Sequence, residues 1–220
     1  MNIENNWDWK THQPLIHLMM GSFEPKLVVE LGMGFNSTPV FLSYNPERYI
    51  GVENDFAWID YMTSKYSFKS EYKVIHHDLK DPSIDCYTQK VNLPERLQDT
   101  LYYKSLADQF IKEAGKPRLL FVDQFTCLRS ISIKTLYKDF DIIIYHDCQQ
   151  EGIDMYDYHF QDIIDSGFEF YILKSPISWT GCLIRPELGY TQTELKGNIH
   201  RYIHIFELTN KVEGLYLEKQ

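Results

Sequence analysis

The chain has 220 residues and a formal net charge of −9 at pH 7, so it is long enough for one α/β domain with a substantial core. The acidic balance excludes a general binder of nucleic-acid backbones, which needs a surplus of basic residues. The four cysteines lack C-x-x-C spacing, and no run approaches the roughly 20 apolar residues that cross a bilayer. We therefore expect no nucleic-acid or membrane partner and a reducing, cytoplasmic setting.

The first predicted strand ends in a glycine turn. Residues 27–31 form a short run of apolar, mostly branched residues that only Glu30 interrupts, and Gly32 and Gly34 follow it. Glycine has no Cβ and tolerates a positive φ, so a ligand can come close to the backbone at such a turn. The pattern predicts a ligand site directly after this strand.

A helix start and a second strand complete this unit. Ser37 or Thr38 can cap a helix whose next residue, Pro39, suits a first turn. The second strand, residues 49–52, ends at Glu53, about 20 residues after the glycines, where a carboxylate can bind a ribose diol. Because position 37 is serine and not the third glycine of a phosphate cradle, the pattern favours a nucleoside-like cofactor without phosphates.

Strands and helices alternate through the rest of the chain, which is typical of a mostly parallel, Rossmann-like sheet covered on both faces. We predict helices at residues 55–66, 97–114 and 151–166, and further strands at 72–77, 118–122, 142–145, 168–173 and 179–184. Residues 81–96 show little periodicity and are predicted to be an inserted loop. Residues 192–220 are predicted to be a tail that packs on the sheet or on a second subunit.

Five of the predicted strands carry an acid at or near their carboxyl end: Glu30, Glu53, Asp78, Asp123 and Asp147. The carboxyl ends of parallel strands meet at one edge of a sheet, and open α/β sheets bind their ligands outside that edge. We therefore expect these five acids to border one crevice.

The acid–glycine turn and the acid after the second strand resemble the class I S-adenosylmethionine-dependent methyltransferases over roughly residues 26–186. The resemblance implies a single domain over residues 1–220, S-adenosylmethionine as cofactor, and a doubly wound sheet of seven strands with a late antiparallel strand. It also implies that residues 1–25, with Trp7, Trp9 and His12, form a lid over the cofactor.

The same resemblance implies a set of cofactor-binding residues. Asp78 is expected to accept from the adenine amino group, and the Leu79 backbone is expected to meet a ring nitrogen. The full set is Glu30, Gly32, Gly34, Ser37, Thr38, Glu53, Asn54, Asp78, Leu79 and Asp123. The alternative for Asp78 is an ordinary turn residue.

The run IIIYHDCQQEG, residues 142–152, resembles the fifth-strand motif of the macrocin O-methyltransferase-like and sugar O-methyltransferases. This resemblance implies a hydroxyl acceptor on a small molecule, most of all a sugar or glycan, with His146 and Asp147 as the catalytic pair. An imidazole titrates near neutral pH and suits a general base. The alternative for His146 is a buried histidine bonded to backbone.

The same family implies a divalent metal, Mg²⁺, with Asp123 and Asp147 as the ligands present here. The usual Asp-Gly-Asp-His after the fourth strand is replaced by Asp123-Gln124-Phe125-Thr126, so the second acid and the histidine are missing. Methyl transfer without a metal therefore stays open, because a sulfonium is already a strong donor.

Two other functions stay open. An NAD-linked oxidoreductase shares the glycine turn and Glu53, but it should show a fuller glycine fingerprint and a catalytic Tyr/Lys or Ser pair, and the sequence has neither. A cofactor-binding but inactive methyltransferase-like partner subunit would account for the missing acid. Arg129 is either a group that holds the acceptor or a solvated cation, and the 15% aromatic content leaves a homodimer open.

Overall fold

The computed structural model describes residues 10–78, 97–124, 126–148, 160–176, 178–210 and 213–219. The predictions for Leu79, for Trp7 and Trp9, and for the inserted loop 81–96 lie outside these ranges. Of the predicted helix 151–166, only the part from residue 160 onward is described.

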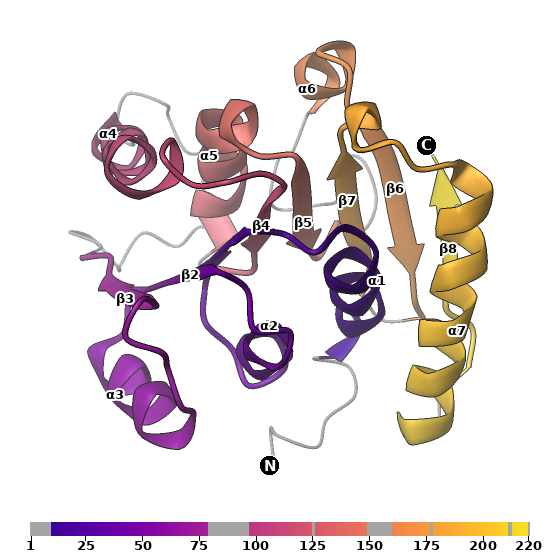
Figure 1. Ribbon diagram of the computed structural model, residues 1–220, viewed down its shortest axis with the longest axis horizontal. Coiled ribbons are helices and arrows are strands. Elements are labelled where there is room, and N and C mark those ends of the chain that lie inside the picture. The colour runs from indigo at the N-terminus through magenta and orange to yellow at the C-terminus, as the bar shows by residue number, and fades with distance from the viewer. Residues whose placement is uncertain are drawn as a thin grey trace.

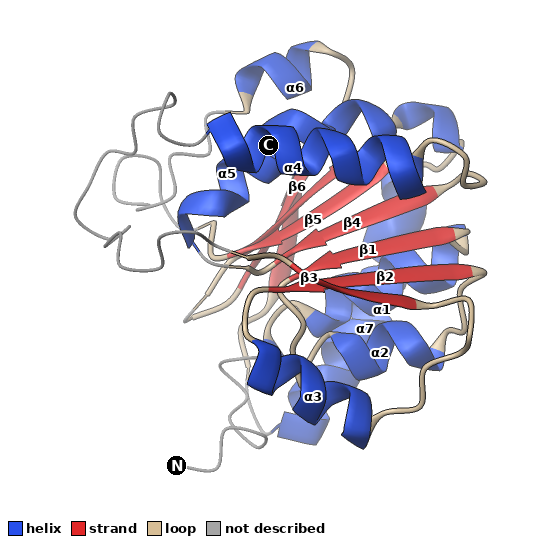
Figure 2. Ribbon diagram, turned by 90° about the vertical axis from the view of Figure 1, so that its left-hand side faces the viewer, coloured by secondary structure: helices blue, strands red, loops and turns tan. Residues whose placement is uncertain are grey.

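Eight strands form one sheet (Figure 2): β1 Leu27–Leu31, β2 Arg48–Glu53, β3 Lys73–His76, β4 Arg118–Val122, β5 Ile142–His146, β6 Glu169–Lys174, β7 Thr180–Ile184 and β8 Tyr216–Lys219. Their order across the sheet is β3-β2-β1-β4-β5-β7-β6-β8. The first five pair in parallel, β7 runs antiparallel to both β5 and β6, and β8 runs antiparallel to β6. The prediction of a mostly parallel, Rossmann-like sheet with a late antiparallel strand is confirmed.

The predicted number of seven strands is wrong by one. The additional strand, β8, lies within residues 192–220, the predicted packing tail. It pairs with the outer edge of β6, where Leu217 lies opposite Leu173. Two of its four residues are charged, so its sequence carries little of the apolar alternation that marks a strand.

The helices cover both faces of this sheet: α1 Gln13–Phe23, α2 Thr38–Ser43, α3 Phe56–Lys65, α4 Leu97–Leu106 with a π turn at Ala107–Ile111, α5 Thr126–Leu136, α6 Gln161–Asp165 and α7 Gln192–Asn210. Helices α4, α5 and α6 lie on one face, and α1, α2, α3 and α7 lie on the other (Figures 1 and 2). Successive residues of the central strands pack into the two cores in turn, since Val28 faces α1 while Leu27 and Val29 face α4. A strand buried on both faces reads as a continuous apolar run.

The described part of the predicted lid forms α1, which is buried in the core. Leu15, Ile16, Leu18 and Met19 are almost completely buried, and α1 lies beside α7 (Figure 1). This packing fixes residues 10–12, just before the helix, over the carboxyl edge of the sheet. Whether the segment closes over a ligand stays a prediction.

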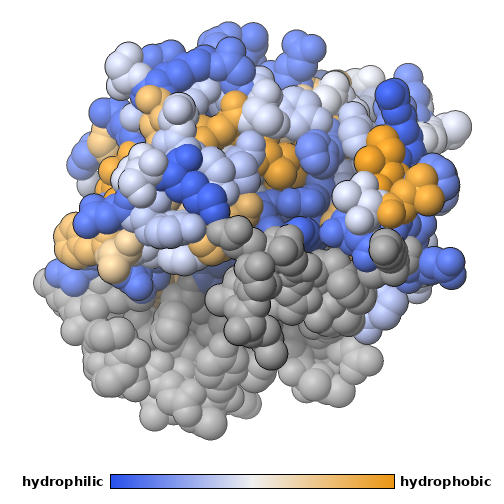
Figure 3. Space-filling model, turned by 90° about the horizontal axis from the view of Figure 1, so that it is seen from below, coloured by the Kyte–Doolittle hydropathy of each residue, from blue (hydrophilic) through white to orange (hydrophobic). Residues whose placement is uncertain are grey.

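Apolar residues that reach the surface are dispersed. The most exposed large ones in the described ranges, Phe56, Leu101 and Leu208, lie on three different helices. On the face drawn in Figure 3 the apolar atoms form separate small patches among hydrophilic ones. Within the described ranges, every helix is too short or too polar to cross a membrane.

Candidate active site

The turn after β1 packs against the backbone at the end of β4. Gly32 has a φ of 87°, in the left-handed region, and a Cβ there would come within 2.6 Å of the Asp123 and Gln124 backbone. Only glycine satisfies both conditions. The turn is also fixed to β2, because the Gly32 N–H donates to the Val52 carbonyl at 2.8 Å. The glycine turn predicted from the sequence therefore holds the ends of three strands together.

Glu30 lies inside β1 and fixes this turn from beneath. Its fully buried carboxylate accepts hydrogen bonds from the Ser37 hydroxyl at 2.5 Å, the Thr38 hydroxyl at 2.9 Å and the Tyr49 hydroxyl. Thr38 in turn accepts from the Gly34 N–H at 3.1 Å. Ser37 is the N-cap residue of α2, but its hydroxyl bonds Glu30 and makes no cap, so the predicted capping role is wrong. These side chains shape the turn, and their predicted contact with a cofactor stays untested.

We expect Glu30 to make stability depend on pH. Burial raises the pKa of this carboxyl from 4.5 to about 7, so the folded protein holds the proton more tightly than the unfolded chain. The contribution of Glu30 to the free energy of unfolding should then fall as pH rises from about 4.5 to about 7, by roughly 3 kcal/mol. His12 acts in the opposite direction over part of this range, because burial lowers its pKa to about 3. Urea denaturation of the parent and of Glu30→Gln across this range should show that the difference between their free energies of unfolding changes by this amount. A difference that stays constant would assign the pH dependence to other groups.

Glu53, at the end of β2, connects two turns. One carboxylate oxygen accepts from the backbone N–H groups of Asn54 at 2.7 Å and Asp55 at 3.1 Å, and the other accepts from the Met33 N–H at 3.1 Å. Burial raises the pKa of this carboxyl, and the three backbone donors act in the opposite direction. A carboxylate has about four lone-pair sites, so one site remains for a ligand hydroxyl.

A pocket opens between Glu53 and the glycine turn. It has about 200 Å³ of empty volume, part of it open to solvent, and is lined by Gly32, Val52, Glu53, Asn54, His77, Gln124 and Leu128. The structure thus brings together the predicted cofactor residues Gly32, Glu53 and Asn54. Asp78 follows this pocket directly in the chain and is exposed.

Two polar side chains in the pocket wall, His77 and Gln124, were not in the predicted cofactor-binding set. The His77 ring stacks on Tyr102 with 3.7 Å between ring centroids. The Gln124 amide accepts from the Tyr103 hydroxyl at 2.9 Å and donates to the Ser132 hydroxyl at 3.0 Å. Both residues lie just beyond a strand end, and this position is the signal that the sequence offered.

A second polar cluster borders the pocket, where β4 and β5 end. Arg129 on α5 donates to Asp123 Oδ1 at 2.8 Å and to Asp147 Oδ2 at 2.9 Å. Its side chain is only 7% exposed and also donates to the carbonyls of Gln124 and His146. The prediction of a solvated cation is therefore wrong, and the guanidinium bridges the two acids.

This bridge argues against the expected Mg²⁺ at Asp123 and Asp147. A hard cation needs several carboxylate and water oxygens, and the guanidinium already engages one oxygen of each acid. With the second acid of the family motif also missing, the pair does not fit a magnesium site.

The predicted catalytic pair, His146 and Asp147, comes together in this cluster. His146 Nδ1 lies 3.5 Å from Asp123 Oδ1 and 3.4 Å from Asp147 Oδ1. Burial favours the neutral ring, but the two carboxylates outweigh it and raise the pKa of His146 to about 9. Ser178 donates to Asp147 Oδ1 at 2.7 Å. Burial acts to raise the pKa of Asp147, but His146, Arg129 and the Ser178 hydrogen bond outweigh it and lower that pKa.

No family model and no curated protein matches the chain. Among solved structures, the chain is similar to a Staphylococcus aureus protein proposed to be a caffeoyl-CoA O-methyltransferase, with a TM-score of 0.50 and 13% identity over 79% of this chain and 82% of that one. NodS, an N-methyltransferase from Bradyrhizobium japonicum bound to S-adenosylhomocysteine, matches at a TM-score of 0.47 and 10% identity over 83% and 89%. Human methyltransferase-like protein 13, also bound to that product, matches at 0.46 and 14% over 94% and 90%. Sheet order and the Staphylococcus likeness together give this chain the Rossmann-like fold of the class I methyltransferases.

Proposed function

We propose that the chain binds S-adenosylmethionine and transfers its methyl group to a hydroxyl of a small molecule, with a sugar or glycan as the acceptor class. The observation that carries the proposal is the shared wall between the pocket and the acid–histidine cluster. Gly32 and Gln124 line the pocket, and Asp123 lies beside both, since its backbone is the one that a Cβ at position 32 would strike.

The charge of this edge supports the cofactor. Glu53 in the pocket wall is the group for the ribose hydroxyls, and no lysine or arginine lines the pocket within the described residues. A cationic, phosphate-free cofactor suits such walls, whereas the two phosphates of NAD would lie beside carboxylates without a compensating base. The pocket is also smaller than a whole cofactor. The methionine part of the cofactor must therefore extend beyond the pocket, and Asp123 lies next to it on that side.

The bound sulfonium supplies an activated methyl group. The protein must then align the acceptor oxygen with the methyl carbon, exclude water, and receive the proton that leaves the hydroxyl. His146 and Asp147 lie at the end of β5, beside Asp123, where an acceptor would meet the methyl group. Their place in the cluster supports the predicted roles of proton acceptor and orienting carboxylate. Because the two carboxylates raise the pKa of His146 to about 9, the ring accepts a proton only in its neutral form, and methyl transfer should become faster as pH rises toward that value.

Calorimetric titration with S-adenosylhomocysteine tests the cofactor, and NAD is the comparison ligand. Micromolar binding of the homocysteine product and none of NAD is the expected result. Binding of NAD alone would favour the oxidoreductase alternative and overturn the proposal. Binding of the product with no turnover on any hydroxylated acceptor would favour the inactive partner subunit.

The Asp147→Asn variant separates the two halves of the site. It keeps the shape of the side chain and removes its charge, so S-adenosylhomocysteine affinity should stay within about twofold of the parent. Transfer of a labelled methyl group to a panel of sugars should fall by about 100-fold or more, as for the loss of an acid–base group. A loss of cofactor affinity would instead move Asp147 out of the acceptor region.

A further inference from the structure

His12 is buried without a polar partner. Its side chain is 2% exposed, and neither ring nitrogen has a hydrogen-bond partner in the described part of the chain. The backbone of Asn36 lies close enough to the ring to affect its pKa but does not meet hydrogen-bond geometry. An unpaired buried polar group is costly and rare in native proteins. We therefore expect one of the two His12 ring nitrogens to bind a ligand.

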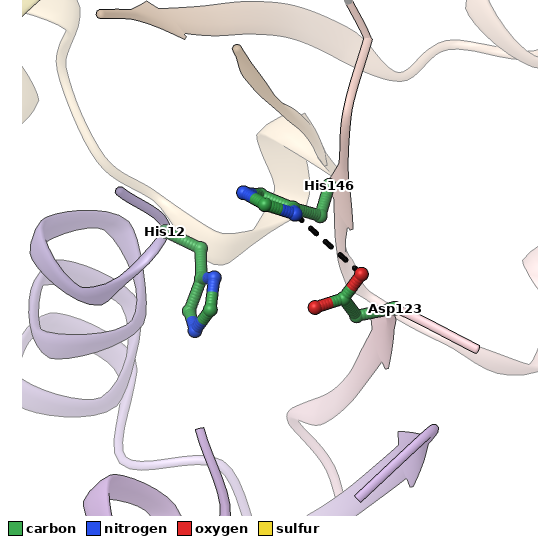
Figure 4. Close-up of side chains that lie close together, drawn as sticks. All are labelled: His12, Asp123 and His146. Carbon is green, nitrogen blue, oxygen red and sulfur yellow. Dashed lines mark ion pairs between the residues drawn. The ribbon is translucent and has the colours of Figure 1, made fainter. Parts of the chain in front are cut away.

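The His12 ring shares a space with two other donors. It packs edge-on against His146, with ring centroids 5.0 Å apart. One ligand atom each from His12, Asp123 and His146 lies within 4.8 Å of the other two. Figure 4 shows the three side chains converging from the segment before α1 and from the ends of β4 and β5, with the His146–Asp123 contact dashed.

The surroundings of these three residues resemble the outer shell of a metal site. With Nδ1 of His146 turned toward Asp123, its Nε2 lies 3.0 Å from the Thr11 hydroxyl and 3.1 Å from the Ser178 hydroxyl. Arg129 orients the Asp123 carboxylate. Metal-binding histidines and carboxylates are usually held by such outer contacts, which fix the ring and the carboxylate in place.

We propose that His12, Asp123 and His146 form a site for a borderline divalent transition-metal ion such as Zn²⁺, Fe²⁺ or Co²⁺. Two imidazoles and one carboxylate match the preferences of these ions and not those of Mg²⁺. The site needs only one oxygen of Asp123, and this carboxylate has lone pairs that its hydrogen bond to Arg129 does not use. Asp123 and Asp147 against the single guanidinium leave one negative charge next to the ion.

The geometry leaves part of the coordination sphere open. The two histidines are buried, whereas the Asp123 side chain is 26% exposed, so the open positions face the side of Asp123. A bound ion there accepts a water or a substrate oxygen as a further ligand and lowers its pKa. In the loaded protein His146 serves as a ligand and is no longer available as a proton acceptor.

The inference does not depend on the proposed methyl transfer. Full-length protein, freed of metal with a chelator, is titrated with Co²⁺ and followed by visible absorption, and bound metal is counted by atomic emission. One Co²⁺ per chain is expected. His12→Ala should weaken Co²⁺ binding by at least about tenfold, and excess Mg²⁺ should not displace the ion.

His204→Ala, at an exposed histidine on α7, is the matched control and should bind Co²⁺ like the parent. Circular dichroism checks the fold, and His12→Gln replaces the alanine variant if the latter does not fold. Folded parent protein that takes up no stoichiometric Co²⁺ overturns the proposal, as does equal affinity in a folded His12 variant. S-adenosylhomocysteine titration of the same chelated sample separates this failure from a failure of the proposed function.

Discussion

Arg129→Met should lower the free energy of unfolding by about 3 kcal/mol, the lower end of the range for breaking a buried ion pair. The guanidinium is nearly buried and makes hydrogen bonds to two carboxylates and two carbonyls. Methionine keeps much of the volume but leaves the two acids with only the His146 ring as a counter-charge. Urea denaturation near neutral pH, where the acids are ionised, measures the loss.

Two further variants make this test specific. Arg129→Lys keeps a positive charge but cannot reach both acids with a planar fork, so it should recover only part of the loss. Adding Asp123→Asn and Asp147→Asn to Arg129→Met should recover most of it, because no uncompensated charge remains. A loss below about 1 kcal/mol in the single variant would mean that solvent screens the pair.

Glu53→Ala should weaken the binding of S-adenosylhomocysteine by about 1–3 kcal/mol, because ribose hydroxyls lose an ionised partner. For Asp78→Ala the loss of binding free energy should lie at the lower end of that range, since Asp78 is exposed. Calorimetry gives both values. Asp60→Ala, at an exposed acid on α3, is the matched control and should bind like the parent.

The Glu53 variant needs a second comparison, because this carboxylate also holds three backbone N–H groups. Glu53→Gln keeps an acceptor oxygen for the turns, so its melting temperature should stay close to that of the parent while affinity still falls. Parent-like affinity in both Glu53→Gln and Asp78→Ala would place the cofactor site elsewhere.

The central strands can be recognised in the sequence because all of their residues are buried. The predicted bounds of β1 and β4 match the structure, since each is an apolar run buried on both faces, with a glycine or an acid after it. Strand β8 was missed for the opposite reason. It exists only because β6 leaves an open edge, and that pairing depends on residues some 45 positions earlier in the chain.

The site was predictable where the order along the chain decides it. Acids at the ends of adjacent parallel strands must be near one another, so Asp123 and Asp147 were expected to meet. Glu30 departs from this rule because it lies inside its strand, with its carboxylate beneath the turn. The Arg129 bridge depends on which face of α5 packs inward, and the sequence alone does not determine that orientation.

His12 was the residue least accessible to prediction. Its neighbours suggested a lid, whereas the apolar side of α1 packs into the core and carries His12 to the end of β5. Contact across more than 130 positions follows from that packing and leaves no local trace in the sequence.

The contact between Gly32 and the Asp123 backbone has a thermodynamic meaning for any pair of ligands that use the two neighbouring sites. A ligand that moves the turn moves the end of β4 with it, so occupation of one site changes the free energy of filling the other. Such coupling is reciprocal by linkage: whatever factor the first ligand applies to the second, the second returns to the first. Each ligand would then show one affinity for the empty protein and another for the protein that already holds its partner. The total free energy of binding both ligands is the same in either order.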